Sequence, residues 1–334
     1  MTDAKRLAHS GLRGFEQGFT DAKAVRMRFF VAGEGPPILL VHGLSGAAAN
    51  WSELAPVLAR RRRVLALDLP GHGGSAPLPA APNLDAYAER VRIVAEQAGL
   101  LPAAVVGHSL GGLVALRLAL RHPGAVTALV LAAPAGISSS TRRAQFWLTV
   151  FGFSRPGRRV APLRGVLAAR PALRASVFNR WQVSDPRSLS EEAVEGLLAP
   201  HELHTDVLSA GRALVRGDPR DALAGVGCPC LVLWGARDRQ VPLDDGFEYA
   251  RRLRAPLRVI ADCGHLLIAE RPEACLDAID GFLDALARRG GTHGSPTDPL
   301  LTGDAPEPRV ATPGKPGSAE ETCRKGTSSH PKKS

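Results

Sequence analysis

A serine between two glycines is the first place in this sequence where residue types and spacing could do chemistry. Residues 105–113 read VVGHSLGGL, so Ser109 lies between Gly107 and Gly111 after an apolar run. A sharp turn from a strand into a helix would strain Ser109, and small neighbours would make room for it. This G-x-S-x-G pattern is typical of a nucleophilic serine at a helix N-terminus, which favours a developing anion. The alternatives are an idle serine in a glycine-rich turn and a phosphate loop, which would need a nearby lysine.

A serine hydroxyl needs a general base, and the base needs an acid that orients it. His265 follows the last apolar run, in ADCGHLLIAERPE, and Asp238 follows the run before it, in ARDRQVP. No carboxylate closely follows the apolar run 126–134. Asp262 is near His265 in sequence but falls within the strand-like run. We therefore predict Ser109 as nucleophile, His265 as base and Asp238 as acid, with loop capping as the alternative role for Asp238.

Two backbone N–H groups are candidates for stabilising an oxyanion. Leu110 directly follows the serine, and Leu44 follows His42 and Gly43 at the end of the apolar run PPILLVHG. A glycine at that position permits a turn that directs the next N–H group into the cleft. His42, Gly43 and His108 are therefore candidate substrate contacts. For His42, hydrogen bonding to neighbouring backbone is the main alternative.

Six apolar runs would position these residues. They lack the alternation of half-exposed strands, which favours a parallel sheet covered on both faces. The runs span 36–43, 63–71, 103–109, 126–134, 228–235 and 257–264. Helical patterns span 50–62, 85–100, 110–124 and 272–289, the first opened by a capping box of Asn50 and Glu53. This order predicts an α/β fold with a mostly parallel central sheet and helices on both faces.

The alternation of strands and helices breaks after the fourth apolar run. Residues 137–224 contain helical stretches and no convincing strand, which predicts a helical cap inserted between two strands of one sheet. After residue 289 the chain is rich in Pro, Gly, Ser and Thr without apolar periodicity, which indicates disorder. The predicted organisation is an N-terminal arm (1–24), a first core segment (25–136), the helical cap (137–224), a second core segment (225–289) and a disordered C-terminal tail (290–334).

The composition is that of a globular protein with a sizeable core. The chain has 334 residues, of which 45% are hydrophobic, and a net charge of +10 carried mostly by arginine. It has no zinc-finger spacing and no aromatic-interleaved basic run, so we predict no nucleic-acid partner. The five scattered cysteines do not form a disulfide pattern. Without a signal peptide or an 18-residue apolar span, the expected location is cytoplasmic.

The predicted cap contains an aromatic and basic stretch at 142–165. It combines Phe146, Trp147, Phe151 and Phe153 with a cluster of arginines. These aromatic side chains could line a hydrophobic substrate pocket with a basic entrance. The alternatives are an amphipathic surface that lies on anionic membranes and a cap helix packed on the core.

Taken in order, the motifs HGLSG, DLPGHGGS, GHSLGG, WGARDRQVP and GH…ERPE resemble those of the α/β-hydrolase superfamily. The resemblance covers residues 25–289 and is strongest to the branch with a helical cap after the sixth strand. It implies the α/β-hydrolase fold, a triad of Ser109, Asp238 and His265, and an oxyanion hole at the two leucine N–H groups named above. Haloalkane dehalogenases and epoxide hydrolases of this superfamily carry an aspartate as nucleophile, and Ser109 differs from both.

The resemblance implies a serine hydrolase that cleaves a carboxylic ester or related carbonyl substrate, preferably lipophilic, through an acyl-enzyme, with no metal and no cofactor. Carbon–carbon bond hydrolases of the superfamily usually have asparagine where His108 stands, but this chemistry remains an alternative. Acyltransferases, cofactor-free perhydrolases and a non-catalytic protein that kept the fold are the others. The expected partner is a small-molecule substrate, with peripheral membrane contact as a lesser alternative and the oligomeric state open.

Overall fold

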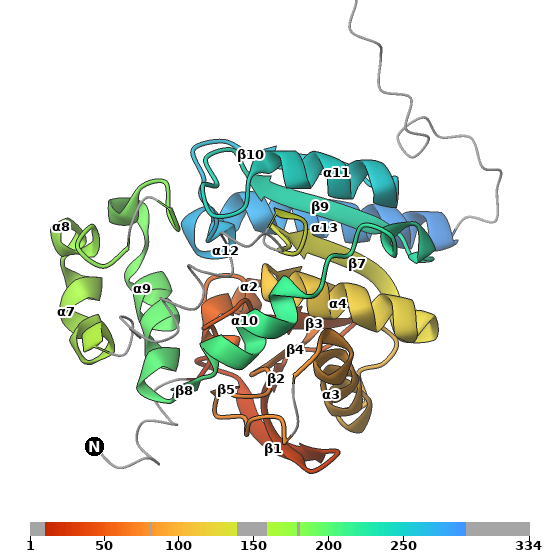
Figure 1. The fold of residues 1–334 in the computed structure, drawn as a ribbon, viewed down its shortest axis with the longest axis horizontal. Helices are drawn as coiled ribbons and strands as arrows, with labels where there is room; N and C mark the ends of the chain where they lie inside the picture. Colours follow the sequence, from red (N-terminus) through yellow and green to blue (C-terminus); the bar gives the residue numbers. More distant parts are fainter. Residues whose placement is uncertain (1–10, 80–81, 139–158, 179–180, 292–334) are drawn as a thin grey trace, which may run out of the picture.

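An eight-stranded sheet forms the centre of the protein (Figure 1). The computed structural model describes residues 11–79, 82–138, 159–178 and 181–291. In spatial order the strands are β1 (Glu16–Ala22), β2 (Val25–Ala32), β4 (Arg63–Leu67), β3 (Pro37–Val41), β6 (Ala103–His108), β7 (Val126–Ala132), β9 (Cys230–Gly235) and β10 (Leu257–Ile260). β2 pairs antiparallel with β1 and β4, and every later neighbour pairs in parallel. The predicted α/β fold with a mostly parallel sheet is confirmed.

The six apolar runs of the sequence correspond to β3, β4, β6, β7, β9 and β10. The central strands β3 and β6 are buried almost along their whole length, as the lack of alternation in their sequences indicates. Parallel strands place their carboxyl ends at the same edge of the sheet. The segments that follow β3, β6, β9 and β10 therefore meet at one edge, and these segments carry every candidate catalytic residue.

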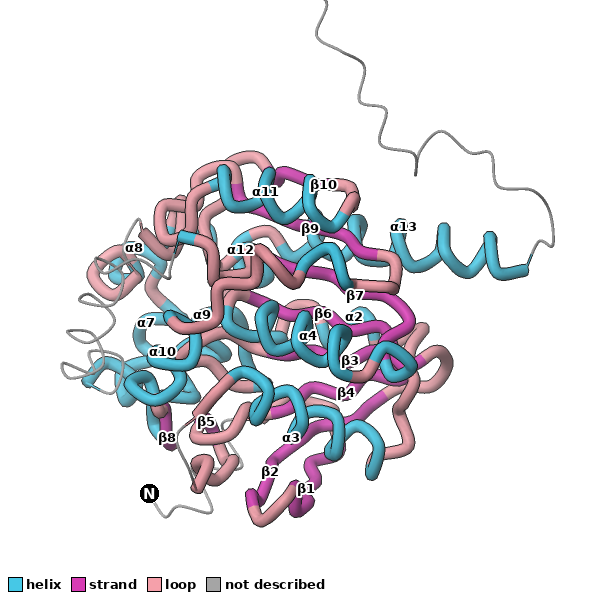
Figure 2. The backbone as a smooth tube through the Cα atoms, turned by 45° about the vertical axis from the view of Figure 1, so that its right-hand side comes forward, coloured by secondary structure: helices cyan, strands magenta, loops and turns pink. Residues whose placement is uncertain are grey.

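Helices cover both faces of the sheet (Figure 2). One face carries α3 (Leu84–Gln97), α4 (Leu110–Arg121) and α11 (Leu243–Leu253), and the other carries α2 (Ala55–Leu58) and α13 (Pro272–Gly291). The Asn83 side chain caps α3 by accepting a 2.8 Å hydrogen bond from Ala86 N–H. The helices predicted at 85–100, 110–124 and 272–289 are present with slightly shifted ends.

The prediction of a helix at 50–62 is wrong. Residues 48–51 form one 3₁₀ turn, and the only α-helix in that range is α2, a single turn. The predicted capping box does not form, because the Asn50 side chain instead accepts a 2.6 Å hydrogen bond from Ala47 N–H, and Glu53 bonds to Ser190. Pro56 has no N–H group to donate to a preceding turn, so a continuous helix through this segment would lose a hydrogen bond.

The hairpin of β1 and β2 was not predicted. Residues 16–22 fall in the predicted N-terminal arm, but they pair with β2 from Glu16 to Ala22 at the edge of the sheet. The two turn residues, Lys23 and Ala24, both have positive φ angles, of 48° and 62°. A two-residue hairpin turn of this kind normally contains Asn or Gly, so its usual sequence signal is absent.

The described residues of the segment predicted as a cap form mainly short helices. The longer ones are α7 (Arg164–Ala169), α8 (Pro171–Arg174), α9 (Glu191–Leu198) and α10 (Val207–Val215). A second hydrophobic cluster joins α7 and α9 and includes Leu167, Phe178, Val183, Leu189 and Val194. One unexpected two-residue strand, β8 (His204–Thr205), pairs with β5 (His72–Gly73) from the core.

Two sets of predictions fall outside the described residues. They are the cap aromatics Phe146, Trp147, Phe151 and Phe153, and the tail predicted from residue 290, apart from its first two residues, which end α13. None of the helices in the described ranges combines the length and the apolar character needed to cross a bilayer. The cytoplasmic location stays a prediction.

Candidate active site

Ser109 lies in the sharp turn between β6 and α4. Its backbone angles, φ 52° and ψ −115°, are strained for a residue with a side chain. The flanking glycines are sterically required: a Cβ atom on Gly107 would lie 2.4 Å from the carbonyl oxygen of Gly111, and one on Gly111 would lie 2.1 Å from that of Val41. The small residues around Ser109 thus allow the chain to turn tightly against β3 and leave the serine at the helix N-terminus.

His265 connects the serine to a carboxylate. Its Nε2 lies 3.0 Å from Ser109 Oγ, and its Nδ1 lies 2.7 Å from Asp238 Oδ2. The other carboxylate oxygen, Oδ1, accepts hydrogen bonds of 2.8 and 2.9 Å from the N–H groups of Gln240 and Val241. Backbone N–H groups of its own loop therefore fix the Asp238 carboxylate. Its Oδ2 accepts a hydrogen bond from the Nδ1–H group of His265. His265 Nε2 is left to accept the serine proton, which is the arrangement that activates a hydroxyl.

Asp262, the second carboxylate near the histidine in sequence, does not belong to this arrangement. Its side chain is 61% exposed and forms an ion pair of 2.5 Å with Arg237. The structure thus brings Asp238 to His265, although 27 positions separate them, and leaves Asp262 at the surface.

His108 contacts both the backbone and the ring of His265. Its Nε2 donates a 2.9 Å hydrogen bond to the backbone carbonyl oxygen of His265, and the two rings lie 5.1 Å apart. Burial, with a smaller effect of the neighbouring His265, lowers the pKa of His108 to about 3, so its ring is neutral at neutral pH. His108 was a candidate substrate contact by sequence, whereas in the structure its buried ring contacts the loop of the candidate base.

Two further hydrogen bonds fix the same loop, and no sequence motif signals them. Glu270 Oε2 accepts a 2.9 Å bond from Gly264 N–H, and Leu266 N–H donates a 3.0 Å bond to the carbonyl oxygen of Gln182. Glu270 also accepts from Ser184 N–H. Burial raises the pKa of the Glu270 carboxyl, although these N–H groups oppose the shift. The segment around 182–184, within the predicted cap, is thereby tied to the residues on both sides of His265.

The candidate oxyanion donors are the N–H groups of Leu110 and Leu44. Leu110 is the first residue of α4, and N–H groups in a first helical turn have no partner within the helix. Leu44 follows Gly43, whose backbone packs against the serine: a Cβ atom on Gly43 would lie 3.1 Å from Ser109 Cβ. Leu110 is thus adjacent to Ser109, and Leu44 follows a residue that packs against the serine, so both N–H groups stay candidates for an oxyanion hole.

His42 is a buried structural residue. Its Nδ1 donates a 2.7 Å hydrogen bond to the Gly43 carbonyl oxygen, and its Nε2 accepts a 2.9 Å bond from Leu69 N–H. Burial lowers the pKa of His42 well below its usual value, so the ring stays neutral. Both ring nitrogens thus bond to backbone. His42 has the alternative role, hydrogen bonding to neighbouring backbone, in place of the suggested contact with substrate.

A buried carboxylate holds the loop that follows His42 and Gly43. Asp68 Oδ1 accepts a 2.8 Å hydrogen bond from Ala48 N–H, and Oδ2 accepts one of 2.8 Å from Gly74 N–H. The fully buried guanidinium of Arg28 lies 3.7 Å from Asp68 Oδ2. Burial raises the pKa of Asp68, and the Arg28 charge opposes this. This contact joins three segments far apart in sequence, so no local motif predicts it.

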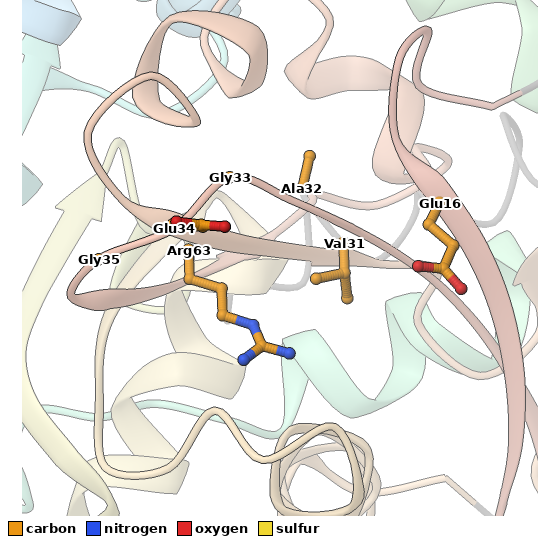
Figure 3. Close-up of a pocket in the computed structure, with 7 residues that line it drawn as sticks. All are labelled: Glu16, Val31, Ala32, Gly33, Glu34, Gly35 and Arg63. Carbon is orange, nitrogen blue, oxygen red and sulfur yellow. The ribbon is translucent and has the colours of Figure 1, made fainter.

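A separate surface pocket lies at the opposite edge of the sheet (Figure 3). Its lining includes Glu16 on β1, Val31 on β2, the loop 33–35 and Arg63 at the start of β4. Because β3 and β4 begin there, the pocket is at the amino ends of the parallel strands, whereas Ser109 follows the carboxyl end of β6. Ligands of open α/β sheets bind at carboxyl ends, so this pocket is separate from the candidate active site.

A family model described as alpha/beta hydrolase fold matches residues 36–272. The chain is 33% identical over 258 residues to the dihydrolipoyllysine-residue acetyltransferase component of the acetoin cleaving system of Pseudomonas putida, covering 76% of this chain and 65% of that protein. The chain thus spans less than two thirds of that relative's length.

Two other relatives are covered over most of their length. The chain is 30% identical over 270 residues to a 2-hydroxymuconate semialdehyde hydrolase of a Pseudomonas species, covering 78% of this chain and 92% of that protein. It is 34% identical over 239 residues to the pimeloyl-[acyl-carrier protein] methyl ester esterase of Chromobacterium violaceum, covering 68% of this chain and 86% of that protein.

Proposed function

Since the chain belongs to the alpha/beta hydrolase family, we propose that it is a serine hydrolase of carboxylic esters in which Ser109, His265 and Asp238 form the catalytic triad. The observation that carries this proposal is the pair of hydrogen bonds from Asp238 through His265 to Ser109, at 2.7 and 3.0 Å. The likeness to a methyl ester esterase supports the ester as the bond that is cleaved.

The proposed reaction proceeds in two halves. Ser109 Oγ attacks the ester carbonyl carbon while His265 Nε2 takes its proton, and the N–H groups of Leu44 and Leu110 stabilise the oxyanion that forms. The intermediate collapses to an acyl-serine, and the alcohol leaves with the proton from His265. In the second half His265 removes a proton from water, which attacks the acyl group. The acid is released and Ser109 regains its proton.

Carbon–carbon bond hydrolysis is the second candidate function. The likeness to a semialdehyde hydrolase over 92% of that protein's length favours it, and the same triad geometry could serve it. The two functions differ in the bond that breaks, so direct assays separate them.

A comparison of substrates tests the proposed ester specificity. We expect hydrolysis of p-nitrophenyl esters, with kcat/KM rising from acetate to octanoate. Each buried CH₂ contributes up to about 0.8 kcal/mol, a few-fold per group. 2-Hydroxymuconate semialdehyde, the compound in the name of the semialdehyde hydrolase, should react far more slowly. Turnover of the semialdehyde without turnover of any ester would reject the ester assignment, and a flat chain-length profile would reject the preference for lipophilic acyl groups.

We expect His108 to act as a positioning residue for the general base. Replacing it with leucine removes the donor to the His265 carbonyl oxygen, and a misplacement of about 1 Å in a catalytic group can cost about 10²-fold in rate. His108→Leu should therefore lower kcat by about 10- to 100-fold with little change in KM. In His108→Gln, the amide nitrogen takes nearly the position of Nε2, so this variant should keep kcat within a few-fold of wild type.

Steady-state kinetics on one ester, with melting curves as the folding control, check this prediction. A structural role alone would lower the melting temperature of His108→Leu but leave kcat unchanged in the folded enzyme. Equal kcat values for wild type and His108→Leu would thus rule out the positioning role.

A further inference from the structure

The exposed large apolar side chains of the protein gather in one stretch of the chain. Of six such side chains in the described ranges, four lie within residues 163–181, and they are between 41% and 62% exposed. These four are Leu163, Val166, Leu173 and Trp181. Scattered single apolar residues are normal on a surface, whereas a cluster of them indicates a binding surface.

Three of these four side chains lie on or directly before two short helices, and Trp181 follows the helices in sequence. In α7, Leu167 and Ala168 are buried in the second hydrophobic cluster, while Val166 and the preceding Leu163 are exposed. Leu163 and Val166 are three positions apart and are therefore neighbours on the helix surface. Leu173 is exposed on α8, which packs against α7. Figures 1 and 2 both show α7 and α8 at the periphery, with the sheet on one side of them.

The segment around this cluster is rich in arginine. Residues 139–184 contain nine arginines, no lysine and no acidic residue, and four of these arginines lie within 163–181. Among the described arginines, Arg159 and Arg170 are exposed and flank the apolar side chains of α7. Arg164, at the start of α7, is half-buried. The exposed side chains of the segment itself are thus apolar and basic, whereas carboxylates follow at Asp185 and at Glu191 and Glu192 of α9, the helix that packs against α7.

We propose that this surface, formed by Leu163, Val166, Leu173, Trp181, Arg159 and Arg170, docks on an anionic lipid bilayer. Apolar side chains among arginines match the boundary between acyl chains and negatively charged headgroups. Tryptophan is enriched at that boundary because its ring is amphipathic. This surface lies at the periphery and is spread over two short helices. Such a surface suits a flat lipid layer better than a ligand that a groove must enclose. Docking goes beyond the proposed hydrolysis and does not depend on it.

Vesicle sedimentation of the full chain tests docking without any catalytic readout. We expect binding to vesicles of phosphatidylcholine with about 30% phosphatidylglycerol at low salt, at least tenfold weaker binding at about 0.5 M NaCl, and little binding to pure phosphatidylcholine. The salt effect follows because screening shortens the reach of surface charges. The chain has four tryptophans, of which Trp51 and Trp234 are fully buried. A blue shift in fluorescence that is lost in Trp181→Phe and kept in Trp147→Phe would report contact at this surface.

Matched variants locate the contact. Arg159→Gln with Arg170→Gln should weaken binding to anionic vesicles by about 10- to 25-fold, since each arginine near such a surface is worth about fivefold. Leu163→Ser with Val166→Ser should also weaken it. Phe247→Ser with Arg251→Gln, on the exposed side of α11, is the control pair and should bind as wild type.

Three results would overturn the proposal. The first is no binding to anionic vesicles at low salt. The second is equal loss of binding in the variants of this surface and in the α11 control pair. The third is binding of soluble poly-glutamate but not of vesicles, which would assign the surface to an acidic protein. Melting curves for each variant show whether it is folded, and an unchanged esterase activity would separate loss of docking from failure of the proposed function.

Discussion

Replacing Ser109 with alanine is expected to lower kcat for ester hydrolysis by about 10⁴-fold or more while the protein stays folded. The hydroxyl is the atom that His265 Nε2 faces at 3.0 Å, and no acyl-enzyme can form without it. Alanine has the same Cβ atom as serine, so it fits between Gly107 and Gly111 with the same backbone strain and creates no new clash.

The matched control for this variant is Ser52→Ala. Ser52 is a half-buried serine whose hydroxyl donates a 3.3 Å hydrogen bond to the Glu192 carbonyl oxygen, away from the triad. This variant should keep kcat within about twofold of wild type, since a hydrogen bond near the surface contributes little to stability. Substantial esterase activity in purified Ser109→Ala, with the same melting temperature as wild type, would remove Ser109 from its proposed role.

Asp238→Asn is expected to lower kcat by about 10²- to 10⁴-fold. Oδ1 of Asp238 accepts from the N–H groups of Gln240 and Val241, so an asparagine would keep its oxygen there and direct its NH₂ group at His265. Nδ1 of His265 would then have to accept, and the proton would move to Nε2. In that tautomer Nε2 donates to Ser109 and cannot remove its proton.

Asp262→Asn is the control for this change. The Asp262 side chain is exposed and pairs with Arg237, and exposed ion pairs are worth about 0–1 kcal/mol. Its kcat should stay within about twofold of wild type, while KM and the melting temperature change little. A large loss of kcat in Asp262→Asn together with a small loss in Asp238→Asn would show that the acid has been assigned to the wrong carboxylate.

The elements of the fold that could be predicted from sequence all have local signals. Uninterrupted apolar runs predicted β3, β4, β6, β7, β9 and β10, and the central strands β3 and β6 are apolar almost throughout because both of their faces are buried. The glycines on either side of Ser109 were the signal for its turn, because only small residues fit there. Asp238 and His265 could be found because parallel strands bring the segments after them to one edge.

The elements that were missed depend on distant partners or lack their usual residues. The β1–β2 hairpin turns at Lys23 and Ala24 without glycine or asparagine, and β1 is largely polar because it lies at the sheet edge. The predicted helix at 50–62 fails because Asn50 bonds to Ala47 rather than capping a longer helix. The contact of Glu270 with Gly264 and Ser184 spans up to 86 positions, and a single sequence carries no signal for it.

His42 and His108 illustrate the same limit at the scale of a side chain. Both are close in sequence to the nucleophile or the candidate oxyanion donors, which suggested contact with substrate. The structure shows instead that His42 joins Gly43 to Leu69 and that His108 holds the carbonyl oxygen of His265. A histidine near a reactive serine in sequence can be a donor to backbone, and only its hydrogen-bond partners distinguish the roles.

The central claim, that Ser109 is a nucleophile activated by His265, is tested most directly by covalent labelling of the full chain with a fluorophosphonate. Mass spectrometry of the intact protein and of its peptides should find one adduct per chain, on Ser109. Asp238→Asn should be labelled much more slowly. Ester hydrolysis by a protein that takes up no label, or that carries its adduct on another residue, would contradict this account.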